Sequence, residues 1–145
     1  MVNDNWWYEC RSHSLKDLDG VVVPPRLAAR PLLPLRVGLK YLSVGMVTFG
    51  SAPYLLVEDD YEDPLFAPMW LFKPQQMTVP ASWQFALIAQ AAAHHPATAD
   101  LGAVAVCGYL ELAGNLDHIA GLVELDDFHV AIFRERVEQL MSGAV

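Results

Sequence analysis

The densest group of charged side chains in this 145-residue chain is a run of five carboxylates within six residues, 58–63. Tyr61 stands among the carboxylates, and an apolar and aromatic segment follows. Such a run creates a negative potential that attracts a basic surface and speeds encounter with it. Aromatic side chains supply the apolar area that anchors an interface. The pattern predicts a partner-binding surface made of Glu58, Asp59, Asp60, Tyr61, Glu62, Asp63, Phe66 and Trp70.

The acidic run also has two simpler interpretations. A solvated loop between two strands carries charge for solubility alone, and most charge runs are of this kind. A calcium site is the other reading, but the run lacks the ligand spacing and the glycine of an EF-hand loop. The sequence therefore leaves a binding surface and a solvated loop as the two alternatives.

The histidines do not form a metal-binding motif. His94 and His95 are adjacent, and neighbours on a helix point about 100° apart, so both cannot easily ligate one metal ion from one face. A position just before Pro96 suits a histidine at a helix C-terminus, where it interacts well with the helix dipole. His118 and His129 each lie close to an aspartate in sequence, but neither HExxH nor HxH occurs. We expect no metal site.

No other motif indicates catalysis or a cofactor. The chain has no GxSxG, no phosphate-binding loop and no GxGxxG. Cys10 and Cys107 are far apart and form no CxxC pair. We expect no catalytic residue and no cofactor, and favour a binding protein over an enzyme. The alternative is a small-molecule-binding domain or enzyme whose pocket lies between sheet and helices, where His118, His129 or Glu111 would converge.

Charge and hydropathy narrow the class of protein further. Seventeen acidic against nine basic residues give a net charge of -8, which argues against binding to nucleic acid. The hydrophobic fraction of 54% and the mean hydropathy of +0.26 exclude global disorder. Two charge-free runs, 41–57 and 74–99, contain too many polar residues and prolines for a membrane-spanning helix. The first residues lack the pattern of a signal peptide. We expect a cytoplasmic protein without a membrane partner.

The first half of the chain has the patterns of strands. Aromatic and β-branched runs predict strands at 6–10, 21–23, 36–49, 54–57 and 69–72. The proline-rich segment 24–34 predicts an extended loop. Gly38 and Gly45 are expected to mark a bend or bulge in the long strand. Trp6 and Trp7 must point to opposite faces if they lie on a strand, so one of them is a candidate for an exposed contact, even for an oligomeric scaffold.

The second half has the spacing of helices. We expect helices from about Pro80 to His94, from 98 to 113 and from 117 to about 125, and a last helix that starts after Asp126 or Asp127 and ends at Gly143. The apolar stripe of the last helix is Val130, Phe133, Val137, Leu140 and Met141.

These elements predict a single α+β domain over residues 1–145, β-rich in 1–76 and helical in 77–145. An N-terminal antiparallel sheet would be followed by a bundle of three to four helices packed against it. The predicted function is that of a small acidic binding protein of the bacterial immunity or antitoxin type. It would inhibit a partner with a basic surface, such as a toxin, by occluding it through the acidic and aromatic surface.

Overall fold

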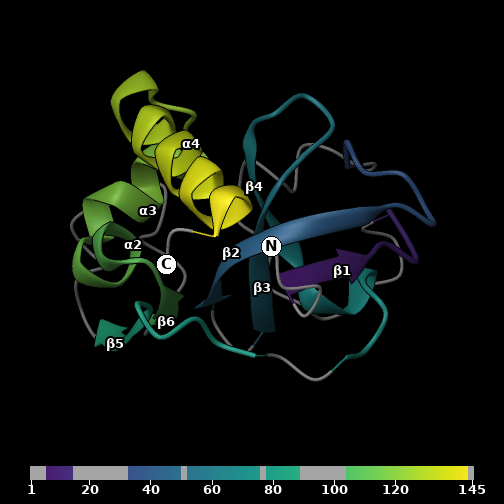
Figure 1. Cartoon of the computed structure of the whole chain (residues 1–145), viewed down its shortest axis with the longest axis horizontal. Coiled ribbons are helices and arrows are strands. Elements are labelled where there is room, and N and C mark those ends of the chain that lie inside the picture. The colour runs from purple at the N-terminus through teal and green to yellow at the C-terminus, as the bar shows by residue number, and fades with distance from the viewer. Residues whose placement is uncertain (1–5, 15–32, 50–51, 76–77, 89–103, 144–145) are drawn as a thin grey trace.

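The computed structural model describes residues 6–14, 33–49, 52–75, 78–88 and 104–143. Within these residues the chain forms a six-stranded antiparallel sheet (Figure 1). The strands are β1 (Trp7–Glu9), β2 (Lys40–Phe49), β3 (Ala52–Glu58), β4 (Pro64–Pro68), β5 (Gln84–Ile88) and β6 (Val104–Gly108). Their order is β4-β3-β2-β6-β5, and β1 pairs with β2.

Strand β2 organises the sheet because three other strands pair with it. Its first residues pair with β1, its middle with β6, and most of its length with β3. The register with β3 shifts between Ser43 and Gly45, so the predicted bulge near Gly45 is confirmed. Val44, Val47 and Phe49 are fully buried, as expected for a central strand with both faces covered.

Three helices follow the sheet: α2 (Leu110–Gly114), α3 (Leu116–Val123) and α4 (Asp127–Ser142). The Asn115 side chain accepts a hydrogen bond from the first turn of α3, and Asp126 does the same for α4. Gly143 ends α4 with a φ of 76°, a left-handed value that glycine adopts without strain. Helix α4 packs on β2, α3 on β4, and α2 on β5 and β6. Figure 1 shows the three helices gathered together, away from β1.

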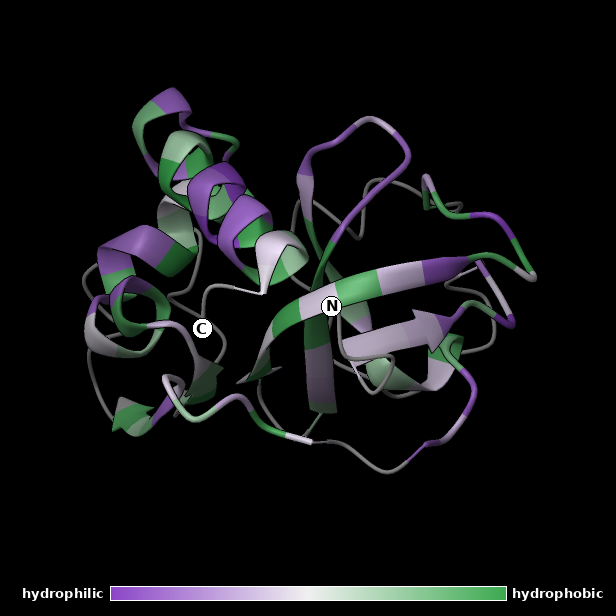
Figure 2. Cartoon of the chain, viewed as in Figure 1, coloured by the Kyte–Doolittle hydropathy of each residue, from purple (hydrophilic) through white to green (hydrophobic). Residues whose placement is uncertain are grey.

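The apolar stripe of α4 faces the sheet. Val130, Phe133, Val137 and Leu140 are buried, whereas Met141, the fifth predicted member, is 46% exposed. Figure 2 shows hydrophilic and hydrophobic residues interleaved along α4, as in an amphipathic helix. The predicted α+β fold, with an antiparallel sheet and C-terminal helices packed against it, is confirmed.

Two of the predicted helices are wrong over part of their described residues. Gln84–Ile88 and Val104–Gly108 are the paired strands β5 and β6, not parts of helices 80–94 and 98–113. Pairing of β6 with the buried strand β2, and of β5 with β6, overrides the helical spacing of these segments. Trp83 is half-buried just before β5 rather than on a buried helix. The end of the second predicted helix agrees with α2, which begins at Leu110, whereas 89–94 and 98–103 lie outside the described residues.

Other local predictions need correction. We predicted a strand at 69–72, but Met69–Leu71 is a 3₁₀ turn. The strand comes directly before this turn, in β4. The predicted strand at 21–23 and most of the loop at 24–34 lie outside the described residues. Trp6 is buried and its indole N–H donates to the Thr78 carbonyl, while Trp7 is half-buried, so neither is the exposed aromatic that we expected. No described helix has the length and apolar character that crossing a membrane requires.

Candidate functional site

The acidic run forms the connection between β3 and β4, and Asp59 gives this loop its shape. One carboxylate oxygen of Asp59 accepts the backbone N–H of Tyr61 at 2.8 Å and that of Asp63 at 3.0 Å. Asp59 is only 8% exposed. A short acidic side chain that closes a turn in this way stabilises one loop conformation. Asp59 therefore supports the predicted surface from inside and does not lie on it.

Two arginines from other parts of the chain form ion pairs with the acidic loop. Asp60 accepts hydrogen bonds from the Arg36 guanidinium at 3.2 Å and from the Tyr41 hydroxyl at 2.8 Å. Asp63 pairs with Arg134 of α4 at 3.4 Å. The hydrogen bonds and charge of Asp60 raise the pKa of Arg36. These contacts hold the loop against the body of the protein.

Asp60, Tyr61 and Glu62 are the exposed residues of the loop, and the last two form its tip. The Tyr61 side chain is 73% exposed, the largest exposure, shared with Leu87, of any described large hydrophobic residue. Glu62 is exposed and has a φ of 63°, a left-handed conformation that costs a residue with a Cβ roughly 1–3 kcal/mol. The loop is thus held in a strained conformation that displays an aromatic ring beside a carboxylate.

A groove of about 550 Å³ runs between this loop and the C-terminal half of α4. Its lining residues are Glu58, Glu62, Arg134, Val137, Glu138, Met141 and Ser142. Burial raises the pKa of the Glu58 carboxyl, and the nearby Glu62 charge raises it further. Three carboxylates beside one guanidinium leave the groove negative, and Met141 gives it an exposed apolar surface.

Phe66 and Trp70 do not belong to this surface. Phe66 is 3% exposed and packs edge to face on Phe49, with ring centroids 5.4 Å apart, so it is a core residue. Trp70 is 39% exposed but follows the far end of β4. At about 3.3 Å per residue, the five residues of β4 put about 13 Å of strand between the loop and the turn that holds Trp70. Proximity in sequence suggested one surface, but an intervening strand separates its parts.

The contribution of α4 to the groove was missed. The sequence assigned Arg134 and Glu138 to a solvated face and Met141 to the core. Their spacing of four and three residues does put the three on one helix face. Only the packing of α4 against β2 shows that this face borders the acidic loop.

A second polar cluster is formed by side chains from the start of α2, from α3 and from α4. The Tyr109 hydroxyl lies 2.5 Å from His118 Nε2, and His118 Nδ1 lies 2.9 Å from His129 Nδ1. Tyr109 and His118 are buried and His129 is half-buried. A Cβ on Gly121 would overlap the His129 ring, so a glycine is needed where α3 and α4 meet. The three side chains form one hydrogen-bonded row from the interior towards the surface.

Burial sets the charge of this cluster. Desolvation, and then the neighbouring His129, lower the pKa of His118 to about 4, so its ring is neutral at pH 7. Burial also raises the pKa of the Tyr109 hydroxyl well above its usual range. Beside the row, Arg136 forms two hydrogen bonds with Glu111 and lowers the pKa of that carboxyl.

This cluster contains residues of the alternative functional prediction, a pocket on which His118, His129 or Glu111 would converge. His118 and His129 do lie together, whereas Glu111 pairs with Arg136, a residue that sequence reasoning missed, as it missed Tyr109. Among the described residues, no three His, Cys, Asp or Glu side chains are grouped so as to hold a metal ion. His94 and His95 lie outside the described residues.

Comparisons with known proteins assign no family to the chain. No protein-family model matches it, and neither the curated proteins nor the solved structures contain a match.

Proposed function

We propose that the protein is a small acidic binding protein that docks a basic surface of a partner protein on its acidic loop and the adjoining groove. The observation that carries this proposal is the groove itself, which Glu58, Glu62 and Glu138 line together with the exposed side chain of Met141. A lysine or arginine of the partner can lay its aliphatic stem on the methionine and place its charge among the carboxylates.

The balance of charge around the groove favours a cationic partner. The loop carries five carboxylates and α4 adds Glu138, against the two guanidinium groups of Arg36 and Arg134. The net negative potential speeds encounter with a basic surface and disfavours acidic proteins.

The rigidity of the loop also supports a role in binding. Asp59 closes the turn, and Arg36 and Arg134 hold its two sides, so Tyr61 is displayed on a fixed backbone. A segment that is already ordered loses less conformational entropy when it binds. Tyrosine is a residue that interfaces favour, because it combines apolar area with a hydroxyl.

An inhibitor of the immunity or antitoxin type is the class of binding protein that we infer. Such an inhibitor occludes the basic active site of a toxin with carboxylates that stand in for the charge of its substrate. The proposed partner is a bacterial toxin of this kind, and the proposed compartment is the cytoplasm.

Affinity purification from the native host tests the proposal with three forms of the protein. The groove variant carries Glu58→Gln, Glu62→Gln and Glu138→Gln. The control variant carries Asp117→Asn, Glu124→Gln and Asp127→Asn, which removes the same charge from exposed positions away from the groove. We expect the native protein and the control to retain the same basic partner, whose activity falls at one-to-one stoichiometry, and the groove variant to lose it. Equal retention by all three forms would contradict the proposal.

A further inference from the structure

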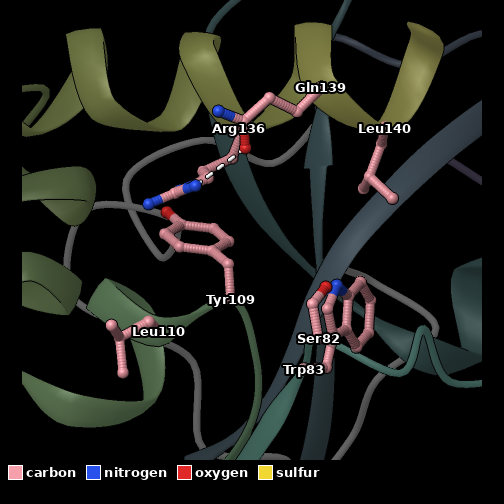
Figure 3. A pocket seen from close by; sticks show the side chains of 7 residues that line it. All are labelled: Ser82, Trp83, Tyr109, Leu110, Arg136, Gln139 and Leu140. Atoms are coloured by element: carbon pink, nitrogen blue, oxygen red, sulfur yellow. Dashed lines mark hydrogen bonds between the residues drawn. The ribbon is translucent and has the colours of Figure 1, made fainter. Parts of the chain in front are cut away.

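A second concave site lies on the opposite face of α4 from the groove. It is a cavity of about 200 Å³, shown in Figure 3. Its lining residues are Ser82, Trp83, Tyr109, Leu110, Arg136, Gln139 and Leu140. Leu110 is 55% exposed and Ser82 is also exposed, so the cavity reaches the surface of the molecule.

The cavity has apolar walls and the size for one aromatic ring. Figure 3 shows Trp83 on one side of the hollow and Tyr109 on the other, with Leu140 of α4 above. A dry cavity of about 150 Å³ lined by apolar side chains is large enough to bind benzene. A cavity of about 200 Å³ therefore has room for a single ring that carries one small substituent.

The polar end of the cavity is uncharged overall. Figure 3 shows the Tyr109 hydroxyl beside the Arg136 guanidinium. Arg136 is already bonded to the Glu111 carboxylate and, at 2.7 Å, to the Gln139 side-chain oxygen. A second carboxylate would compete with Glu111 for the same guanidinium in a partly desolvated place. The cavity is thus better suited to a neutral ligand than to an anion.

The row of Tyr109, His118 and His129 allows only two arrangements of its protons when all three groups are neutral. In the first, the Tyr109 hydroxyl donates to His118 Nε2, His118 Nδ1–H donates to His129 Nδ1, and His129 Nε2 carries its proton outward. In the second, every bond is reversed: His129 Nδ1–H donates to His118 Nδ1, and His118 Nε2–H donates to the Tyr109 oxygen. The Tyr109 proton is then released from the row and needs another acceptor.

We propose that the cavity binds a small uncharged aryl carbonyl compound, whose ring lies between Trp83 and Tyr109 and whose carbonyl oxygen accepts the hydrogen bond of the Tyr109 hydroxyl. Binding selects the second arrangement, because only there is the hydroxyl proton directed away from His118. It follows that the outward nitrogen of His129 changes from a donor to an acceptor when the ligand binds. Ligand binding in the cavity thereby changes the hydrogen-bonding role of an outward-facing atom, and the net charge of the protein stays the same.

A nuclear magnetic resonance titration with three probes of similar size tests this site. Acetophenone is the neutral aryl carbonyl, benzoate is its anionic counterpart, and ethylbenzene lacks the acceptor. With acetophenone at millimolar concentration we expect saturable shifts of the Trp83 and Tyr109 resonances. We also expect the ¹⁵N shift of His129 Nε2 to move from a protonated to an unprotonated value. Benzoate should bind about tenfold more weakly, since its charge would have to be desolvated.

The Tyr109→Phe variant isolates the hydroxyl. We expect it to weaken acetophenone binding about tenfold and to leave ethylbenzene binding unchanged within a factor of about two. Trp83→Ala should weaken both probes together, because it removes the aromatic wall. The His129 signal of the native protein serves as a readout that needs no variant, should Tyr109→Phe fold poorly.

Three results would overturn the inference. These are no saturable shift with acetophenone, an unchanged His129 ¹⁵N shift at saturation, or tighter binding of benzoate than of acetophenone. None of them bears on the acidic groove, which uses the other face of α4.

Discussion

The Nδ1 atoms of His118 and His129 lie 2.9 Å apart, so one proton is shared between two rings that belong to different helices. A proton on both atoms would replace this hydrogen bond with repulsion between two donors. The contact between α3 and α4 therefore keeps its hydrogen bond only while at least one of the two rings is neutral.

Protonation of His118 should destabilise the protein at mildly acidic pH. Burial, and then His129, lower the pKa of His118 from 6.5 to about 4 in the folded state, so the unfolded chain binds this proton more strongly. The contribution of the neutral ring is complete above about pH 6.5 and is lost as the pH falls towards 4. We expect a loss of roughly 3 kcal/mol in the free energy of unfolding over this window.

Urea unfolding at several pH values checks this loss. The His118→Gln variant is the control, because it keeps a polar side chain but cannot titrate. Its free energy of unfolding should fall less steeply than that of the native protein between about pH 6.5 and 5, where most carboxylates stay ionised. Parallel curves for the two proteins would contradict the expectation.

Gly121→Ala should be destabilising even though it lies inside a helix. An alanine normally favours a helix over glycine by about 0.5–1 kcal/mol. Here the added Cβ would overlap the His129 ring, and such overpacking costs about 1–3 kcal/mol. In a His129→Ala background the ring atoms are gone and only the Cβ of residue 129, at 3.0 Å, remains close, so the same substitution should cost less. Thermal unfolding of the two single variants and the double variant measures the cost in each background, and an equal cost in both would locate the clash elsewhere.

Phe133→Ala should lower the free energy of unfolding strongly, and Phe128→Ala on the same helix should lower it only slightly. Phe133 is fully buried in the core, and truncation of a buried phenylalanine costs about 3–5 kcal/mol. Phe128 is 69% exposed, so its truncation should cost about 0.5 kcal/mol. Chemical denaturation of both variants tests the face of α4 that packs on the sheet, and equal losses would show that this face is wrongly placed.

Glu62→Gly should raise stability and weaken partner binding together. Glycine adopts the left-handed backbone of position 62 without strain, so we expect a gain of up to about 1 kcal/mol in the free energy of unfolding. The variant also removes one carboxylate of the groove. Glu62→Gln is the matched control: it should weaken binding equally without the gain in stability. If both glutamate variants bind the partner like the native protein, Glu62 takes no part in the interface.

Local patterns were sufficient to predict α4 and the pairing region of β2 and β3. Asp126, the buried stripe through Phe133 and Leu140, and Gly143 are all contained within one segment, so the period of the sequence alone predicts the helix. The long strand with its bulge at Gly45 was predictable for the same reason.

Strands β5 and β6 were not predictable from their own residues. Phe85 and Leu87 of β5 are exposed while Ala86 is half-buried, the reverse of the usual alternation. Strand β6 has the sequence Val-Ala-Val-Cys-Gly within an alanine-containing segment of helical spacing, and it forms because β2, far away in sequence, supplies its hydrogen-bonding partner. The candidate site likewise has one part that its local sequence predicts and one part that it does not. The acidic loop is visible in the sequence, but its partner helix face and the Tyr109–His118 contact arise only from long-range packing.

The pairing of Gly45 with Gly108 has a consequence for synthesis of the chain on the ribosome. The antiparallel neighbours β2, β3 and β4 follow one another directly and can pair as soon as they emerge. The edge of β2 that receives β6 must wait for about sixty more residues, or about 3–12 s at typical elongation rates. During that delay an apolar strand keeps unpaired N–H and C=O groups, a state that invites pairing between nascent chains. Fast translation of this interval should therefore improve the yield of folded protein.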